Sequence, residues 1–186
     1  MTVIVALIDK KRKEVYIGAD SAGADDKFNL RIRKDIKIFE TGDFLVGYTS
    51  SFRMGQLLRF NFNPPKQKKE QTNFEYMCTD FIETVREKLK KGGYTKIKEN
   101  EELGGTFIVI YKNQIYKIDN DFQVAEAYDE YDACGCGEPY ALGSLYSSRK
   151  LSFQERIIRA LKCAEHFSAG VRRPFRIIKK SFEGGK

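Results

Sequence analysis

The chain has 186 residues, 41% of them hydrophobic and 32% charged, with a formal net charge of +7 at pH 7, and this composition predicts one globular domain over residues 1–186. No apolar run approaches the ~20 residues that a membrane helix needs, and no basic segment precedes the apolar residues 3–8, which argues against a membrane span and a secretory signal peptide. We therefore expect a cytoplasmic protein without membrane contact, and the scattered Lys and Arg favour a solvated surface over a nucleic-acid partner.

The first part of the chain predicts two β-hairpins. Residues 3–8 and 15–19 are β-branched runs separated by a charged turn. Residues 36–40 alternate apolar and polar side chains, and 44–48 return after a Thr-Gly-Asp turn. We expect the two hairpins to pair into one sheet.

Two helices should follow. Hydroxyl side chains at 49–51 are suited to cap a helix that begins at Phe52 and must end before the two prolines at 64 and 65. Residues 63–73 are polar and predict a surface loop. A second helix starts near Phe74, follows a helical apolar period to Leu89, and stops at Gly92.

The second half predicts a meander, two more helices and a last strand. The meander strands are expected at 106–111, 114–118 and 122–125, with short polar turns between them. A glycine-rich loop at 133–137 leads into one helix, and Ser152 with Glu155 has the spacing of a capping box for the next. A final strand is expected at 174–178. Sheets stacked face to face with helix pairs outside would bury all these apolar faces.

The four cysteines predict neither disulfides nor a metal site. Cys78, Cys134, Cys136 and Cys163 lack disulfide spacing. The Cys134 and Cys136 pair has only His166 and carboxylates to complete a zinc site, which is too few ligands. We expect no metal and no cofactor.

Several short motifs, in order, resemble those of the proteasome β-subunit and HslV peptidase family. They are a Thr that opens the first strand, GADSAG at the end of the second, DIKIFETGDFLVG, a GxG loop before a helix, and a helix that ends in AEHFSAG. The resemblance runs from Thr2 to about residue 178, although residues 60–105 carry no matching motif. It implies an α+β N-terminal nucleophile (Ntn) hydrolase fold, a four-layer αββα sandwich.

The resemblance implies that Thr2 is the nucleophile and, through its own nitrogen, the general base. A threonine hydroxyl is a weak nucleophile until a base takes its proton, and an α-amine with a pKa of ~7.7–8.0 is suited to that role near neutral pH. The amine is free only when Met1 is removed. A retained Met1 would block Thr2.

Two charged residues match the family's supporting pair. Lys37 stands where the KIF-type motif carries the active-site lysine, ten residues before Gly47. Asp20, at the end of the second strand, would hold Lys37 by a charge-assisted hydrogen bond. Taken alone, Asp20 could be a turn cap and Lys37 the polar half of an edge strand.

Four further positions match family site residues, and three of them differ in residue type. The Ser51 amide is the candidate oxyanion donor, although the family usually has glycines at 50 and 51. Cys136 replaces the Ser of the family's GSG motif, and a thiol is the weaker hydrogen-bonding group. Glu165 and Ser168 match the supporting Asp and Ser at the end of the last helix, and Glu is one methylene longer. His166, between them, is interpreted as a surface or packing residue.

The prediction is therefore a threonine endopeptidase that assembles into a homo-oligomeric ring, cleaves polypeptide substrates inside a chamber, and is fed by an ATP-dependent unfoldase ring. The alternative is a catalytically inactive subunit of the same fold, which Cys136, the serines at 50 and 51 and a retained Met1 would favour. A small-molecule amidohydrolase and a nucleic-acid-binding domain are the weaker alternatives, because the Thr start favours a peptidase and no nucleic-acid-binding motif is present.

Overall fold

A computed structural model describes residues 1–25, 27 and 29–182 of the chain. Its first sheet has the strand order β12-β1-β2-β13, and all its pairs are antiparallel. The strands are β1 (Ile4–Asp9), β2 (Glu14–Ala19), β12 (Tyr131–Cys134) and β13 (Arg176–Ser181). The predicted first hairpin and last strand are confirmed, and Lys13, at a φ of 55°, closes the charged turn.

The second sheet has the strand order β11-β10-β9-β6-β5 and is also antiparallel. Its strands are β5 (Ile38–Thr41), β6 (Phe44–Tyr48), β9 (Phe107–Tyr111), β10 (Gln114–Ile118) and β11 (Val124–Glu126). The predicted meander is thus confirmed. Two short hairpins lie outside both sheets, β3 (Ala22–Ala24) with β4 (Leu30–Ile32) and β7 (Lys96–Lys98) with β8 (Glu101–Leu103).

The prediction that the first two hairpins join one sheet was wrong. The β1–β2 hairpin and the β5–β6 hairpin belong to different sheets, which face each other. Every residue of β1 and of β6 is buried. The apolar pattern of these strands therefore shows that both of their faces are covered, but it does not show which other elements cover them. At Gly47 a Cβ atom would lie 2.5 Å from Ile4 Cγ2, so glycine allows the two sheets to approach closely there.

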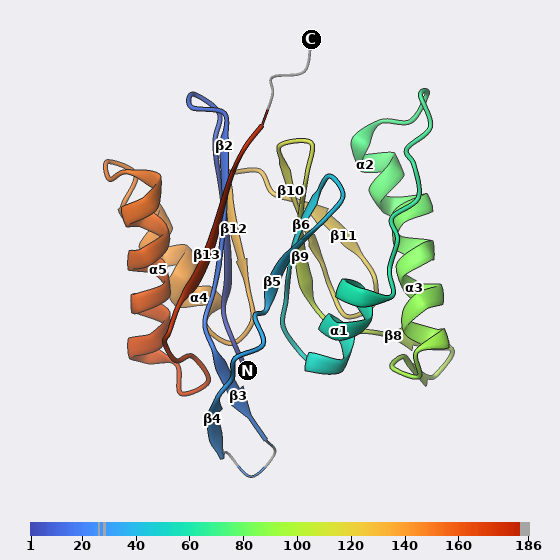
Figure 1. The fold of residues 1–186 in the computed structure, drawn as a ribbon, viewed down its shortest axis with the longest axis horizontal. Coiled ribbons are helices and arrows are strands. Elements are labelled where there is room, and N and C mark those ends of the chain that lie inside the picture. The colour runs from blue at the N-terminus through green and yellow to red at the C-terminus, as the bar shows by residue number, and fades with distance from the viewer. Residues whose placement is uncertain (26, 28, 183–186) are drawn as a thin grey trace.

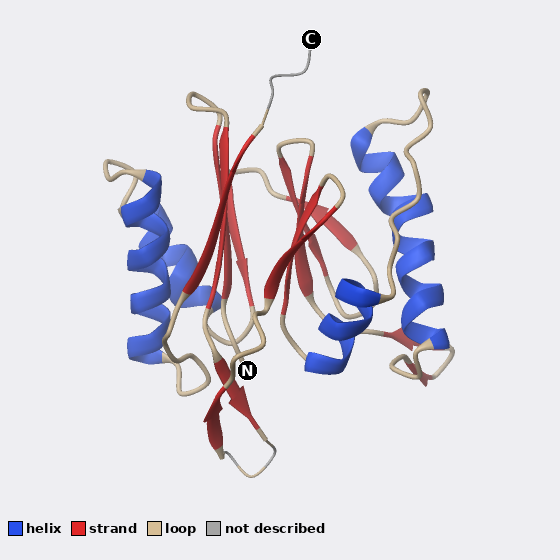
Figure 2. Cartoon of the chain, in the orientation of Figure 1, coloured by secondary structure: helices blue, strands red, loops and turns tan. Residues whose placement is uncertain are grey.

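Helices cover the outer faces of both sheets (Figures 1 and 2). They are α1 (Phe52–Phe60), α2 (Asn73–Tyr76), a π-helical turn (Met77–Phe81), α3 (Ile82–Lys91), α4 (Glu138–Ser147) and α5 (Phe153–Phe167). Helices α4 and α5 pack on the first sheet, and α1 to α3 pack on the second. The capping box that Ser152 forms with Glu155 is confirmed.

The apolar side chains therefore form three layers of core. One lies between α4, α5 and the first sheet, one between the two sheets, and one between the second sheet and α1 to α3. The α+β class with antiparallel sheets is confirmed. Both ends of the sheet stack expose loops, and the N-terminus lies at the end where the β3–β4 hairpin projects (Figure 1).

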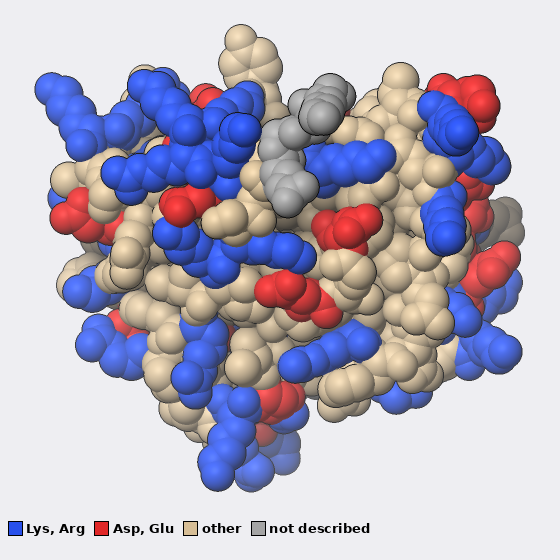
Figure 3. Space-filling view, turned by 45° about the horizontal axis from the view of Figure 1, so that its top comes forward, with Lys and Arg blue, Asp and Glu red and all other residues tan. Residues whose placement is uncertain are grey.

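Charged side chains lie on the surface in mixed groups. Figure 3 shows Lys and Arg side chains over much of one face, with Asp and Glu among them. Pairs such as Lys10 with Glu130, Lys179 with Glu14 and Lys180 with Glu40 have N···O distances of 3.6, 2.6 and 3.1 Å. In the described part of the chain, no helix is both long enough and apolar enough to cross a bilayer.

Candidate active site

Strand pairing in the first sheet brings Thr2 to Asp20. Ile4 is the register partner of Ala19, so the residues just before β1 and just after β2 meet at the same sheet end. Thr2 and Asp20 are each 1% exposed. The Thr2 hydroxyl donates a hydrogen bond to Asp20 Oδ1.

Lys37 reaches the same point from the second sheet. It directly precedes β5, and its carbonyl accepts a hydrogen bond from the Tyr48 N–H (3.0 Å), which fixes its place beside β6. Its Nζ lies 2.5 Å from Thr2 Oγ1 and 2.8 Å from Asp20 Oδ1. The stacking of the two sheets therefore assembles a buried hydroxyl, carboxylate and ammonium group.

Backbone amides hold the Asp20 carboxylate in place. Oδ1 accepts a hydrogen bond from the Val3 N–H (3.2 Å), and Oδ2 accepts from the N–H groups of Ala22 (2.8 Å) and Arg172 (3.2 Å). Donors of this kind stabilise the ionised carboxylate and fix its orientation. Asp20 can thus orient both Thr2 and Lys37.

The Lys37 ammonium is buried, with 2% of the residue exposed. Burial lowers the pKa of Lys37, while the nearby Asp20 carboxylate acts in the opposite direction. A cation in a dry site exerts a strong field on the oxygen beside it. Its position next to Thr2 Oγ1 therefore favours the ionised form of that hydroxyl.

Cys136 contacts the nitrogen side of Thr2. Its Sγ accepts a hydrogen bond from the Thr2 N–H (3.2 Å) and lies 3.3 Å from the Thr2 carbonyl oxygen. Gly135, at a φ of 99°, allows this approach, since a Cβ there would lie 2.4 Å from the Thr2 carbonyl oxygen. The Gly137 N–H donates to the same oxygen (3.2 Å). The glycines on both sides of Cys136 thus fit the loop against Thr2.

Of the two residues near the end of α5, only Ser168 contacts the site. Its hydroxyl donates to Cys136 Sγ (3.2 Å). Glu165 instead binds Arg173, with the Arg173 N–H at 2.8 Å from Oε1 and Nη2 at 2.6 Å from Oε2. Hydrogen bonds from Arg173 lower the pKa of Glu165. Glu165 therefore makes no side-chain hydrogen bond to Thr2, Cys136 or Ser168. Its support for the site remains a prediction, and His166 is exposed.

Ser51 caps α1, and its amide is already bonded. The Ser51 hydroxyl accepts from the Arg53 N–H (3.1 Å), as its N-cap position predicts. The Ser51 N–H donates to the Thr49 carbonyl (2.6 Å) across Ser50, whose φ is 58°. The Ser50 hydroxyl accepts from the Thr106 N–H (3.0 Å), which helps to hold this turn. An oxyanion would have to take the Ser51 N–H from Thr49, so its catalytic role remains a prediction.

The sequence did not reveal the contribution of Arg172 to the site. The Arg172 N–H reaches Asp20, and its guanidinium donates to the carbonyls of Glu165, Ser168 and Val171 (3.3, 3.4 and 2.7 Å). This contact ties the end of α5 to the carboxylate. A backbone N–H can be donated by almost any residue type, so no residue pattern marks it.

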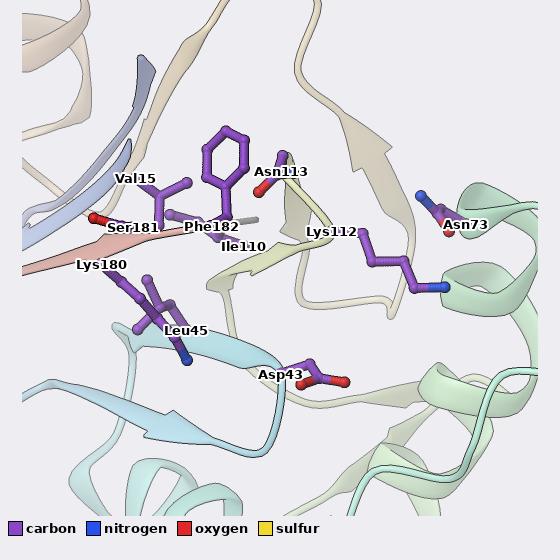
Figure 4. Close-up of a pocket in the computed structure, with 10 residues that line it drawn as sticks. All are labelled: Val15, Asp43, Leu45, Asn73, Ile110, Lys112, Asn113, Lys180, Ser181 and Phe182. Carbon is purple, nitrogen blue, oxygen red and sulfur yellow. The ribbon is translucent and has the colours of Figure 1, made fainter. Parts of the chain in front are cut away.

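Two cavities open on Thr2, and a larger cavity lies elsewhere. About 50 Å³ of space adjoins Thr2 on the side of Lys37, Tyr48 and Phe52, and about 380 Å³ adjoins it on the side of Cys136. The larger cavity, about 680 Å³, lies at the opposite end of the sheets. Figure 4 shows its lining residues, among them Val15 from the first sheet and Ile110 from the second.

No metal centre accompanies the Thr2 cluster. Residues 26, 28 and 183–186 aside, no group of three or more His, Cys, Asp or Glu side chains is placed to hold a metal ion. The chemistry that the arrangement can perform is that of an oriented hydroxyl beside a buried cation, with the Cys136 sulfur next to the Thr2 nitrogen and Ser168 bonded to that sulfur.

The fold is that of HslV- and proteasome-like proteins, and the resemblance found in the sequence is confirmed at the level of the fold. By sequence, the chain matches no family model and no curated protein. Its relationship to proteins of this class is therefore visible in three dimensions.

Among solved structures it is similar to BPH of Thiobacillus denitrificans in complex with epoxomicin, with a TM-score of 0.79, 18% identity, and 98% of this chain and 100% of that one covered. It is also similar to HslV of Trypanosoma brucei, with a TM-score of 0.68, 13% identity, and 97% and 100% covered. Anbu, the ancestral beta-subunit, of Yersinia bercovieri gives a TM-score of 0.66, 13% identity, and 97% and 82% covered.

Proposed function

We propose that the chain is a threonine endopeptidase of the proteasome and HslV kind, acting through Thr2 after removal of Met1. The observation that carries this proposal is the convergence of Lys37 Nζ and Asp20 Oδ1 on Thr2 Oγ1. An ion pair that served stability alone would not need a buried hydroxyl between two sheets. The proposal includes a single domain and the four-layer αββα sandwich.

In the proposed reaction the free amine of Thr2 takes the proton of its own hydroxyl, while Lys37 stabilises the developing alkoxide. Oγ1 attacks the peptide carbonyl, the C–N bond breaks, and the amine proton passes to the leaving nitrogen. Water, deprotonated by the same amine, then hydrolyses the ester and returns Oγ1 as a hydroxyl. Cys136 and Ser168 would orient the amine, because Sγ lies 3.2 Å from the Thr2 nitrogen.

The negative charge on the attacked carbonyl oxygen needs donors. The Ser51 N–H is the proposed donor, and it borders the smaller cavity at Thr2. Its bond to Thr49 would be exchanged for one to the oxyanion when substrate binds. Glu165 would act at a distance by fixing Arg173 and the chain beside Arg172, whose N–H holds Asp20.

Assembly into a homo-oligomeric ring is part of the proposal. A peptidase site open to all solutes would attack folded neighbours, whereas a chamber admits only unfolded chains. Apolar residues project from the two small hairpins, with Ile32 53% and Ile97 70% exposed, as expected of surfaces that a neighbouring copy covers. An ATP-dependent unfoldase ring would deliver the polypeptide substrates, and we propose a cytoplasmic location.

The alternative is an inactive subunit of the same fold. Two observations favour it: the Ser51 N–H is occupied by the Thr49 carbonyl, and a thiol stands at position 136. A covalent adduct on Thr2 with a hydroxyl-directed electrophile would eliminate this alternative.

The test is hydrolysis of peptide reporters by protein released from a fusion whose cleavage leaves Thr2 first, as checked by intact mass. We expect hydrolysis to fall at least about 100-fold in Thr2→Ala and to persist in Thr2→Ser. A Thr2→Ala protein that hydrolyses the reporters as fast as the wild type would contradict the proposal. Intact mass of the unfused protein shows whether Met1 is removed in the cell.

A further inference from the structure

The space around Thr2 is unequal on its two sides. The cavity beside Lys37, Tyr48 and Phe52, which Met1 also lines, has about 50 Å³ while Met1 is in place. The cavity on the side of Cys136 has about 380 Å³ even with Met1 among its lining residues and falls within the ~300–1,000 Å³ of ordinary ligand sites. A large side chain beside the cleaved bond therefore has room on the Cys136 side.

Charged side chains are among the residues that line the larger of these two cavities. Lys117 belongs to β10, Asp119 directly follows β10, and Glu138 begins α4. Lys117 Nζ lies 2.7 Å from Glu138 Oε1, and these side chains are 19% and 28% exposed. This ion pair bridges the second sheet and the helix that follows the Cys136 loop, so the cavity has a fixed polar wall.

The polar wall contains two carboxylates and only one ammonium group, so it carries an excess negative charge. Lys117 and Glu138 neutralise each other, and the partly buried Asp119 carboxylate has no hydrogen-bond donor among the residues that the structure describes. Burial alone would lower the pKa of Lys117, but the nearby Glu138, Asp119 and Asp132 carboxylates raise this pKa overall. Partly buried charges are screened less than exposed ones, so the excess acts on whatever enters.

We propose that this cavity is a substrate subsite selective for a cationic side chain, Lys or Arg, next to the cleaved bond, with Asp119 as its specificity-determining residue and the Lys117–Glu138 pair as its rigid wall. The inference rests on the proposed function. An acidic side chain in the same place would meet the Asp119 and Glu138 carboxylates, while Lys117 is already paired with Glu138. A cationic one would bind Asp119 and displace only solvent.

The test uses protein that begins at Thr2 and peptide reporters with Lys, Gln or Glu at each of the two positions flanking the cleaved bond. At one of these positions we expect kcat/KM to be about tenfold higher for Lys than for Glu. Asp119→Asn should reduce this ratio severalfold, and Asp119→Lys should invert it. Hydrolysis of the Gln reporter reports on the catalytic machinery, and Asp121→Asn, the same change in the following turn outside the cavity, is the matched control.

The outcomes separate the two proposals. Hydrolysis by the wild type with the same Lys to Glu ratio in Asp119→Asn and Asp119→Lys would overturn the subsite and leave the peptidase intact. Absence of hydrolysis of every reporter would overturn the proposed function and the subsite with it. A shift of the ratio in Asp121→Asn as large as in Asp119→Asn would assign the preference to long-range charge and overturn the subsite.

Discussion

Lys37 and Thr2, which lie 35 residues apart and belong to opposite sheets, meet with Nζ 2.5 Å from Oγ1 in a site where neither residue is more than 2% exposed. Burying an ammonium group costs free energy unless a partner compensates it. Asp20, 2.8 Å from Nζ, supplies that compensation. The three side chains therefore form one unit, and removing any one of them changes the environment of the other two.

The first prediction concerns this unit. Lys37→Met should abolish peptide hydrolysis and lower the free energy of unfolding by about 3 kcal/mol, because it leaves the Asp20 carboxylate buried without its cation. The double variant Asp20→Asn with Lys37→Met should regain part of that stability while staying inactive. Urea denaturation of the two single variants and the double variant measures the coupling. Equal stability of wild type and Lys37→Met would show that the pair is not buried as described.

The second prediction concerns the thiol at position 136. Cys136→Ser should raise the hydrolysis rate of Thr2-first protein by about two- to tenfold, because a hydroxyl is a stronger hydrogen-bonding group toward the Thr2 nitrogen and Ser168 than a thiol. Cys136→Ala should lower the rate. Cys78→Ser is a control away from the site. A Cys136→Ser enzyme slower than the wild type would mean that the sulfur itself is needed.

Much of the site was predictable because its residues stand at the ends of recognisable strands. Asp20 follows a β-branched run, and Lys37 begins an alternating one, so the resemblance and the strand pattern selected the same positions. The structure then brings Thr2, Asp20 and Lys37 together, and it brings Cys136 to the Thr2 nitrogen and Ser168 to Cys136.

What the sequence could not show depends on contacts across the fold. Strands buried on both faces, such as β1 and β6, have the same apolar pattern whether they pair in one sheet or lie in two stacked sheets. The two hairpins were therefore assigned to one sheet. The bond between the Ser51 N–H and the Thr49 carbonyl depends on the positive φ of Ser50, which no side-chain pattern encodes. Glu165 was assigned to the site because it matches the position of the family's supporting Asp, whereas the partner of its side chain, Arg173, comes from the following loop.

The third prediction concerns packing behind the site. A Cβ on Gly55 of α1 would lie 2.1 to 2.4 Å from three ring atoms of Tyr48, the last residue of β6. Gly55→Ala should therefore lower the free energy of unfolding by about 2–3 kcal/mol through overpacking, despite the better helix propensity of Ala. Gly143→Ala in α4, where a Cβ meets nothing within 4 Å, is the matched control and should stabilise by about 0.5–1 kcal/mol. Thermal unfolding of both variants tests this prediction. A Gly55→Ala protein as stable as the Gly143→Ala control would contradict the close contact with Tyr48.

The fourth prediction concerns pH and the ion pair beside the site. Hydrogen bonds from Arg173 hold the pKa of Glu165 below its ordinary 4.5. A carboxylate with a lowered pKa in the folded state contributes stability that is fully present above the unfolded pKa and is lost as pH falls through the folded value. Glu165→Gln should thus destabilise the protein at pH 7, by no more than about 1 kcal/mol because Arg173 is largely exposed. That difference should shrink steadily as pH falls from about 4.5. The measurement is denaturation across this pH range of the wild type, of Glu165→Gln and of the control Glu87→Gln, an exposed position in α3. A loss of stability in Glu165→Gln that stays constant with pH would mean that the side chain acts by packing and not by charge.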